Sequence, residues 1–305
     1  MDSLETFAHA RVGLLGNPSD IYGGKGVGFA VRQLKASVRL TPGEPTPLEG
    51  KLLQAGWSVA ESALREAGAH VEGQPFRLEV ETNIPLQSGL SGSSAILTAA
   101  FRAWQRWFEV SWSRARLAQL VLATEVEELG IRAGALDRLV QSYEGLVAMD
   151  FSRPFAPDAT QRLDPGLLPE LLIVWSPERG KSSGQVHEPI WERFQAGDPA
   201  IRSVVEELAE LADQGRRALL ARDLGHLRRL IDRNFDLRAQ LFEIEPSDLR
   251  MIEIGRDMGA ATKFCGSGGS VLALPDRPER MAELRSAYED RGLKTLIPGV
   301  IEPRP

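Results

Sequence analysis

The sequence predicts an α+β protein built from two domains, residues 1–160 and 161–305. Segments with the period of strands alternate with segments with the period of helices in both halves, which is typical of mixed α+β domains. Residues 151–169 carry several prolines and are interpreted as the linker between the two halves. A chain of 305 residues is long enough for two ordinary domains.

In the first half, short apolar or alternating runs predict strands at residues 11–15, 26–40 and 76–82. Three prolines within ten residues predict a loop at residues 41–50. The following segment, residues 51–69, has apolar side chains on one helical face and predicts an amphipathic helix. The order is therefore strand, strand, helix, strand.

The next elements are a glycine- and serine-rich loop and three helices. The loop covers residues 83–94, and a long helical stretch begins directly after it. Two further helices are predicted at residues 113–129 and 132–144, the first with Ser113 as its N-cap.

The second half repeats the mixture of strands and helices. Residues 171–175 predict a buried strand, and residues 200–221 and 224–241 predict long helices. Residues 263–275 pass from a glycine turn into the strand sequence SVLAL. No internal repeat interrupts this pattern.

Composition excludes several classes of function. The formal net charge of −6 leaves no basic surface for nucleic acid. The single cysteine, Cys265, excludes an intramolecular disulfide and a zinc site built from cysteines. The N-terminus is acidic rather than basic, and no apolar run approaches the roughly 20 residues of a membrane helix. We therefore expect a cytoplasmic protein that binds neither nucleic acid nor membrane.

The loop that precedes the first long helix predicts phosphate binding. Its sequence from Pro85 is PLQSGLSGSSA, with two glycines and four serines before the helix. Glycine lets the backbone approach an anion closely, and the helix directs free N–H groups and its positive dipole end at the phosphates. Ser94, where the loop meets the helix, is a candidate ligand for magnesium. No lysine follows the glycines, so this is not a Walker A loop.

A second candidate segment carries carboxylates. Phosphoryl transfer needs a carboxylate that helps to hold magnesium, and it benefits from one that orients or deprotonates the attacking hydroxyl. Glu125 and Asp137 take these roles if the turn at Gly130 brings them together. The alternative is that Glu125, Glu127 and Glu128 form a solvated helix face. Asp137 is flanked by apolar residues and is expected close to a buried face.

Three segments in the same order resemble the GHMP kinases (galactokinase, homoserine kinase, mevalonate kinase and relatives). They are RVGLLGNPSDIY from Arg11, PLQSGLSGSSA from Pro85 and KFCGSGGSVLAL from Lys263. Two further segments are similar to the plant-type glucuronokinases within that superfamily. They are the run ELGI–AG–DR ending in GLVAMDF, and SGQVH at residues 183–187. The resemblance implies an N-terminal domain like domain 2 of ribosomal protein S5 and a ferredoxin-like C-terminal domain.

The resemblance also implies a role for each matching residue. Asp137 matches the catalytic aspartate, Arg11 the basic residue beside the transferred phosphoryl group, and Asp20 the sugar-binding aspartate. Ser94 and Glu125 match the magnesium ligands. The residues expected to bind ATP are Pro85, Ser88, Gly89, Leu90, Ser91, Gly92, Ser93 and Ser94. Those expected to bind the substrate are Asn17, Asp20, Tyr22, Lys25, Arg132, Lys181, Gly266, Ser267 and Gly268.

The sequence departs from the family pattern in two places. The phosphate loop has one extra residue between Gly89 and the Ser93-Ser94 pair, and the third motif reads GSGG instead of the commoner GAGxGG. The first difference leaves the register of Ser91 and Gly92 open. The second leaves the contacts of the third motif open.

The resemblance implies an ATP- and Mg²⁺-dependent kinase acting on the anomeric hydroxyl of a monosaccharide, D-glucuronate above all. A uronate needs a cationic partner, ideally a bidentate arginine. The candidates are Lys25, Arg132, Arg179 and Lys181. The alternatives are another acceptor (galacturonate, galactose, arabinose, mevalonate or homoserine) and a non-catalytic sensor of ATP and sugar. A homodimer is left open.

Overall fold

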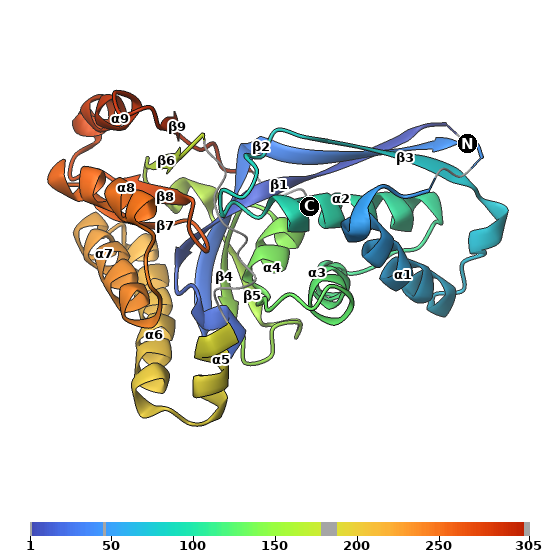
Figure 1. Ribbon diagram of the computed structural model, residues 1–305, viewed down its shortest axis with the longest axis horizontal. Helices are drawn as coiled ribbons and strands as arrows, with labels where there is room; N and C mark the ends of the chain where they lie inside the picture. The colour runs from blue at the N-terminus through green and yellow to red at the C-terminus, as the bar shows by residue number, and fades with distance from the viewer. Residues whose placement is uncertain (1, 45–46, 178–187, 302–305) are drawn as a thin grey trace.

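The computed structural model describes residues 2–44, 47–177 and 188–301, and within them it contains two antiparallel sheets (Figure 1). The first sheet has five strands: β1 (Leu4–Leu15), β2 (Lys25–Pro42), β3 (Phe76–Thr82), β4 (Leu146–Asp150) and β5 (Thr160–Leu163). The second has four, in the order β7-β8-β6-β9: β6 (Leu172–Trp175), β7 (Ala261–Phe264), β8 (Ser270–Leu274) and β9 (Lys294–Leu296). The predicted α+β class is confirmed.

The long strand β2 organises the first sheet. One edge pairs with β1 along most of its length, while the other edge pairs with β4 near its beginning and with β3 near its end. Pro42 is tolerated because it closes the strand, where a missing N–H costs little. The first strand extends beyond the predicted residues 11–15 and begins at Leu4. The prediction missed its first part because the buried polar residues Thr6 and His9 interrupt the apolar pattern of β1.

Four α-helices lie in the described residues of the first half of the chain. They are α1 (Gly50–Glu66), α2 (Gly92–Trp107), α3 (Arg114–Ala123) and α4 (Leu136–Tyr143). Ser113 caps α3 as predicted, because its side chain accepts the N–H of Arg116. Helix α3 then passes into a π-helical turn at Thr124–Glu128.

The prediction of a helix from residue 132 was wrong. Helix α4 begins only at Leu136. Gly130 has a positive φ of 65°, so the chain turns there, and residues 131–135 run past Asp20 without helical structure. This turn brings Glu125 and Asp137 to the same place, as the sequence suggested.

The second half contributes α5 (Glu188–Gln195), α6 (Pro199–Ala221), α7 (Leu224–Leu241), α8 (Pro246–Asp257) and α9 (Met281–Glu289). The predicted bounds of α7 are confirmed, and those of α6 differ by one residue. In Figure 1, α6 to α9 gather at one end of the molecule, away from α1.

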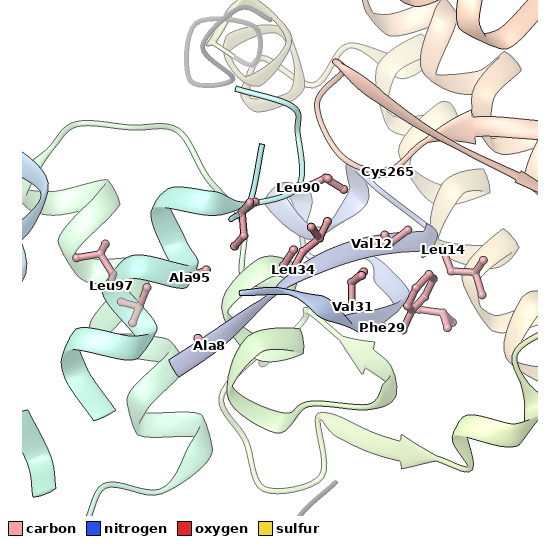
Figure 2. Close-up of a cluster of buried hydrophobic side chains, with 14 of the residues drawn as sticks. Ala8, Val12, Leu14, Phe29, Val31, Leu34, Leu90, Ala95, Leu97 and Cys265 are labelled. Carbon is pink, nitrogen blue, oxygen red and sulfur yellow. The ribbon is translucent and has the colours of Figure 1, made fainter. Parts of the chain in front are cut away.

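One hydrophobic core joins the two halves. Side chains of β1, β2 and α2 form its centre, and Figure 2 shows Val12, Phe29 and Leu97 among them. The same core includes Leu208 and Leu227 from the later helices. The two halves of the chain therefore share buried apolar contacts.

The segment predicted as a linker is not without structure. Within residues 151–169, strand β5 (Thr160–Leu163) pairs with β4 in the first sheet. The division of the chain at residues 160 and 161 stays a prediction, and the first sheet continues to Leu163.

Candidate active site

A cavity of about 430 Å³ lies where the two halves of the chain meet. All eight residues expected to bind ATP line it, as do Arg11, Glu125 and Asp137. The second half of the chain contributes Arg238, Cys265, Gly266 and Ser267 to its wall. Residues far apart in the sequence therefore converge on one site.

Arg11 and Asp137 form a bidentate ion pair at the cavity wall. Strand β1 presents Arg11, whose Nε and Nη2 donate to the two carboxylate oxygens of Asp137 at 2.5 and 2.7 Å. Ser91 donates to Oδ2 of the same carboxylate at 2.8 Å. The side chain of Asp137 keeps 18% of its surface exposed, which leaves it accessible to a ligand.

The ion pair keeps Asp137 ionised. Burial opposes its charge, but the attraction of Arg11 and Arg138 and the hydrogen bonds from Arg11 and Ser91 outweigh burial and lower its pKa to about 2. Asp137 is therefore a carboxylate throughout the neutral range. It can accept a hydrogen bond from a substrate hydroxyl without a prior change of protonation.

Ser94 and Glu125, the two predicted magnesium ligands, are hydrogen-bonded to each other. Ser94 lies in the first turn of α2, and its hydroxyl donates to Oε1 of Glu125 at 2.9 Å. Glu125 lies in the π-helical turn and is 2% exposed. Its other oxygen accepts a hydrogen bond from Nε of Arg138 at 2.5 Å.

The oxygen pair fits Mg²⁺. This ion takes oxygen ligands, uses one or two carboxylates, and completes its shell with water and nucleotide phosphates. Ser94 and Glu125 supply one hydroxyl and one carboxylate oxygen on the cavity wall. Within the described residues no cluster of three or more acidic, histidine or cysteine side chains could hold a metal ion.

Arg138 is a site residue that the sequence reasoning missed. It is 5% exposed, forms an ion pair with Glu125 and donates from Nη1 to the carbonyl of Gly134 at 2.9 Å. Its Nη1 also lies 3.7 Å from Oδ2 of Asp137. It follows directly after Asp137 on a helix with apolar neighbours, and an arginine in such a position needs a buried partner. That signal was present in the sequence.

The phosphate loop is shaped by its contact with the glycine turn of the second half. Gly89 has a φ of 68°, and a side chain there would collide with the carbonyl of Gly268. A side chain at Gly266 would in turn meet Nη1 of Arg11 at 2.7 Å. The two turns therefore approach each other at backbone distance, which only glycine permits.

The register of the loop follows from the start of α2. Ser91 takes a left-handed conformation with φ 63° directly before the helix, which begins at Gly92. Its hydroxyl contacts Asp137 instead of capping the helix. The backbone N–H groups of the first turn of α2 remain available for an anion.

Asp20 lies between the cavity and the beginning of α4. Its Oδ2 accepts the N–H of Leu136 at 3.3 Å. Burial, followed by repulsion from Asp137, raises its pKa to about 6. Ionised Asp20 is thus costly in the free protein at neutral pH, and this is typical of a group that is held for a ligand.

This shift predicts a pH-dependent stability. Between its usual pKa near 3.8 and about 6, Asp20 binds more protons in the folded than in the unfolded chain. The free energy of unfolding therefore decreases as pH rises through this window. We expect Asp20→Asn to raise the free energy of unfolding at pH 7 by roughly 1–2 kcal/mol and to lower activity. Urea unfolding at pH 4.5 and pH 7 checks this, and equal effects at both values would contradict it.

The predicted substrate residues are only partly brought together. Asn17, Asp20, Arg132, Gly266 and Ser267 line the cavity, whereas Tyr22, Lys25 and Gly268 do not. Lys181, like Arg179 and the SGQVH segment, lies outside the described residues.

Two of the residues away from the cavity have clear structural surroundings. The ring of Tyr22 packs against Trp191 and Phe194 with centroids 5.9 and 4.8 Å away. Lys25 is exposed at the start of β2, where its backbone pairs with Asp150. Their role in substrate binding stays a prediction.

Asn17 is fixed from the second half of the chain. Nζ of Lys263 donates to its Oδ1 at 2.8 Å, and Nδ2 of Asn234 donates to its carbonyl at 3.1 Å. Lys263 also donates to the carbonyls of Gly13 and Phe264. Burial lowers the pKa of Lys263 to about 7, and these three acceptors give its ammonium group a structural role.

The fold and this site define a nucleotide-dependent kinase class, and the comparisons with known proteins agree. Residues 55–145 match the family model of the GHMP kinases N terminal domain, and residues 216–293 match that of the GHMP kinases C terminal domain. The chain belongs to the GHMP kinase family.

Two relatives from Arabidopsis thaliana match nearly the whole chain. Probable glucuronokinase 2 is 35% identical, with 93% of this chain and 87% of the relative covered. Glucuronokinase 1 is 34% identical, with 99% and 93% covered. The crystal structure of Lactococcus lactis galactokinase complexed with galactose shares the fold with a TM-score of 0.81 at 15% identity, over 98% of this chain and 93% of that chain.

Within the described residues, no helix has both the length and the apolar character needed to cross a bilayer.

Proposed function

We propose that this protein is an ATP-dependent sugar kinase that phosphorylates the anomeric hydroxyl of D-glucuronate and forms D-glucuronate 1-phosphate. The observation that carries the proposal is the convergence of the Arg11–Asp137 ion pair, the Ser94–Glu125 pair and the phosphate loop on one cavity. The match to two glucuronokinases over nearly the full chain supports the substrate. We also propose a cytoplasmic location and leave open a homodimer.

ATP is proposed to place its phosphates over the loop from Gly89 to Ser94. The N-terminus of α2 and the loop backbone then face the phosphates, which is a favourable arrangement for an anion. When bound by Ser94 and Glu125, Mg²⁺ would neutralise charge on the nucleotide. Arg11 lies beside Asp137 and offsets charge on the transferring group.

Asp137 is proposed to orient the acceptor. It accepts a hydrogen bond from the anomeric hydroxyl, whose oxygen bonds to the γ-phosphorus while the bond from phosphorus to the bridging oxygen of ADP breaks. The hydroxyl proton passes to Asp137. A carboxylate with a pKa near 2 is a weak base, so positioning is its larger contribution. A loose transition state needs little base catalysis before the phosphoryl group moves.

The expected result with purified protein is selective turnover of D-glucuronate. ADP release is measured with Mg-ATP against glucuronate, galacturonate, galactose, arabinose, glucose and N-acetylhexosamines, with mevalonate and homoserine as distant controls. Phosphorus NMR should then show an anomeric phosphate. Turnover of a different acceptor would support the kinase activity and contradict the proposal of a uronate substrate. ATP binding without turnover of any acceptor would contradict the whole proposal.

A further inference from the structure

Arg238 occupies an unusual position in the cavity wall. It lies on α7, is 3% exposed, and lines the same cavity as Asp20 and Asp137. Its Nη2 donates to the carbonyl of Ser267 at 2.8 Å. The rings of Phe242 and Phe264 lie 4.7 and 5.5 Å from its guanidinium carbon and hold the group in place.

The charge of Arg238 has no close partner within the described part of the protein. No carboxylate oxygen there lies within 4.0 Å of it, and its buried Nε has no hydrogen-bond acceptor. Asp248 attracts it from farther away, while Oδ2 of Asp248 accepts the N–H of Gly269 at 3.0 Å. Burial lowers the pKa of Arg238 only to about 10, so the group remains a cation at neutral pH.

The other cationic side chains of the cavity are already engaged. Four arginines and no lysine line it among the described residues. Arg11 is paired with Asp137 and Arg138 with Glu125. The guanidinium of Arg132 lies 4.8 Å from the ring of Trp191 on α5. Arg238 differs because its guanidinium group is held in place by its neighbours, yet its Nε–H group has no hydrogen-bond acceptor.

Buried charges in proteins are almost always paired or bound to a ligand of opposite charge. An arginine that lacks such a partner in a substrate cavity therefore indicates an anionic ligand group. The planar guanidinium fits a carboxylate in a bidentate way. The phosphate loop and Ser94 are already proposed to bind the phosphates of ATP. The anionic group that pairs with Arg238 therefore belongs to the second ligand, the sugar.

We propose that Arg238 binds the carboxylate of the acidic sugar and so selects uronates over neutral sugars. This inference rests on the proposed function and adds the residue that determines the specificity for acidic sugars. The carbonyl of Ser267 orients the guanidinium, and the ring of Phe264 supports it from the second sheet. The sequence did not indicate Arg238, because helix α7 is rich in charged residues that mostly face solvent.

The test compares D-glucuronate with D-glucuronamide, which has the same ring but no charge. Wild-type protein should prefer glucuronate. Arg238→Met should lower kcat/KM for glucuronate by about 10- to 150-fold, the loss expected for hydrogen bonds to a charged group. The value for glucuronamide and the KM for ATP should change by less than about threefold, so that the preference disappears. The kcat/KM of Arg238→Lys for glucuronate should lie between those of the wild type and Arg238→Met.

Two controls separate this role from a general loss of structure. Arg233→Met removes an arginine from the same helix that pairs with Glu207 on the surface, and it should leave both sugars unaffected. Because no carboxylate among the described residues pairs with the buried charge of Arg238, Arg238→Met should not lower the melting temperature greatly, although it removes the hydrogen bond to Ser267. A large decrease in melting temperature would assign Arg238 a structural role and overturn the inference.

The remaining outcomes distinguish the inference from the function on which it rests. If the wild type prefers glucuronate and Arg238→Met keeps that preference, the kinase function stands and the role of Arg238 is wrong. If the wild type turns over only neutral sugars, the proposed substrate class fails before any variant is compared, and the role of Arg238 fails with it. A matching rise in the KM for ATP would assign Arg238 to the nucleotide instead.

Discussion

Replacing Asp137 by asparagine is expected to lower kcat by about 10²- to 10⁴-fold and to leave the affinity for ATP nearly unchanged. Asparagine has almost the same shape but carries no charge. It can still accept from Ser91, yet it loses the charge-assisted pair with Arg11 that fixes the carboxylate toward the cavity. The acceptor hydroxyl would then lose both its orientation and its proton acceptor. The phosphate loop is untouched, which is why nucleotide binding should persist.

The measurement is steady-state kinetics with glucuronate, together with the binding of a non-hydrolysable ATP analogue by calorimetry. Asp158→Asn is the matched control, because it makes the same chemical change at an exposed ion pair with Arg153. The variant must be assayed well below its melting temperature, since Arg11 loses a buried partner. A variant of Asp137 with more than about a tenth of wild-type kcat would show that this carboxylate is not central to the reaction.

The parts of the site that follow local sequence patterns could be predicted. The loop before α2 and the carboxylates on either side of Gly130 belong to short segments whose residue types already indicate phosphate and metal chemistry. The structure brings these segments together, with Ser94 in contact with Glu125 and Ser91 in contact with Asp137. Periodicity likewise predicted β3 and α7 with the bounds observed.

The parts that depend on tertiary pairing could not be predicted. Arg238 looks like an ordinary helix charge in the sequence. The apolar neighbours of Arg138 indicate burial, but its partner Glu125 is known only from the structure. The reverse holds for Lys25, which stands in a motif but is exposed away from the cavity. The role of a charged residue depends on its burial and on its neighbours in the folded structure, and the local sequence does not show these.

Arg138→Met is expected to lower the free energy of unfolding by about 3–5 kcal/mol. The substitution fills similar space but leaves Glu125, at 2% exposure, with only the hydroxyl of Ser94 as a hydrogen-bond partner. A buried carboxylate without a cation either stays ionised at a high cost or takes up a proton. If Glu125 takes up a proton, it should also bind metal less well. Urea unfolding at pH 7 measures the first effect, and the Mg²⁺ dependence of kcat measures the second.

The double variant Arg138→Met with Glu125→Gln separates stability from activity. Removing the stranded charge should restore most of the lost free energy of unfolding, because a neutral amide is less costly to bury than an unpaired carboxylate. Activity should not return, since the carboxylate proposed to bind the metal is gone. Arg233→Met, at the exposed pair with Glu207, should change stability by less than about 1 kcal/mol. If the single Arg138 variant is no less stable than this control, the pair with Glu125 does not hold the site together. If the double variant is active, Glu125 is not the metal ligand, and the role assigned to the oxygen pair with Ser94 is wrong.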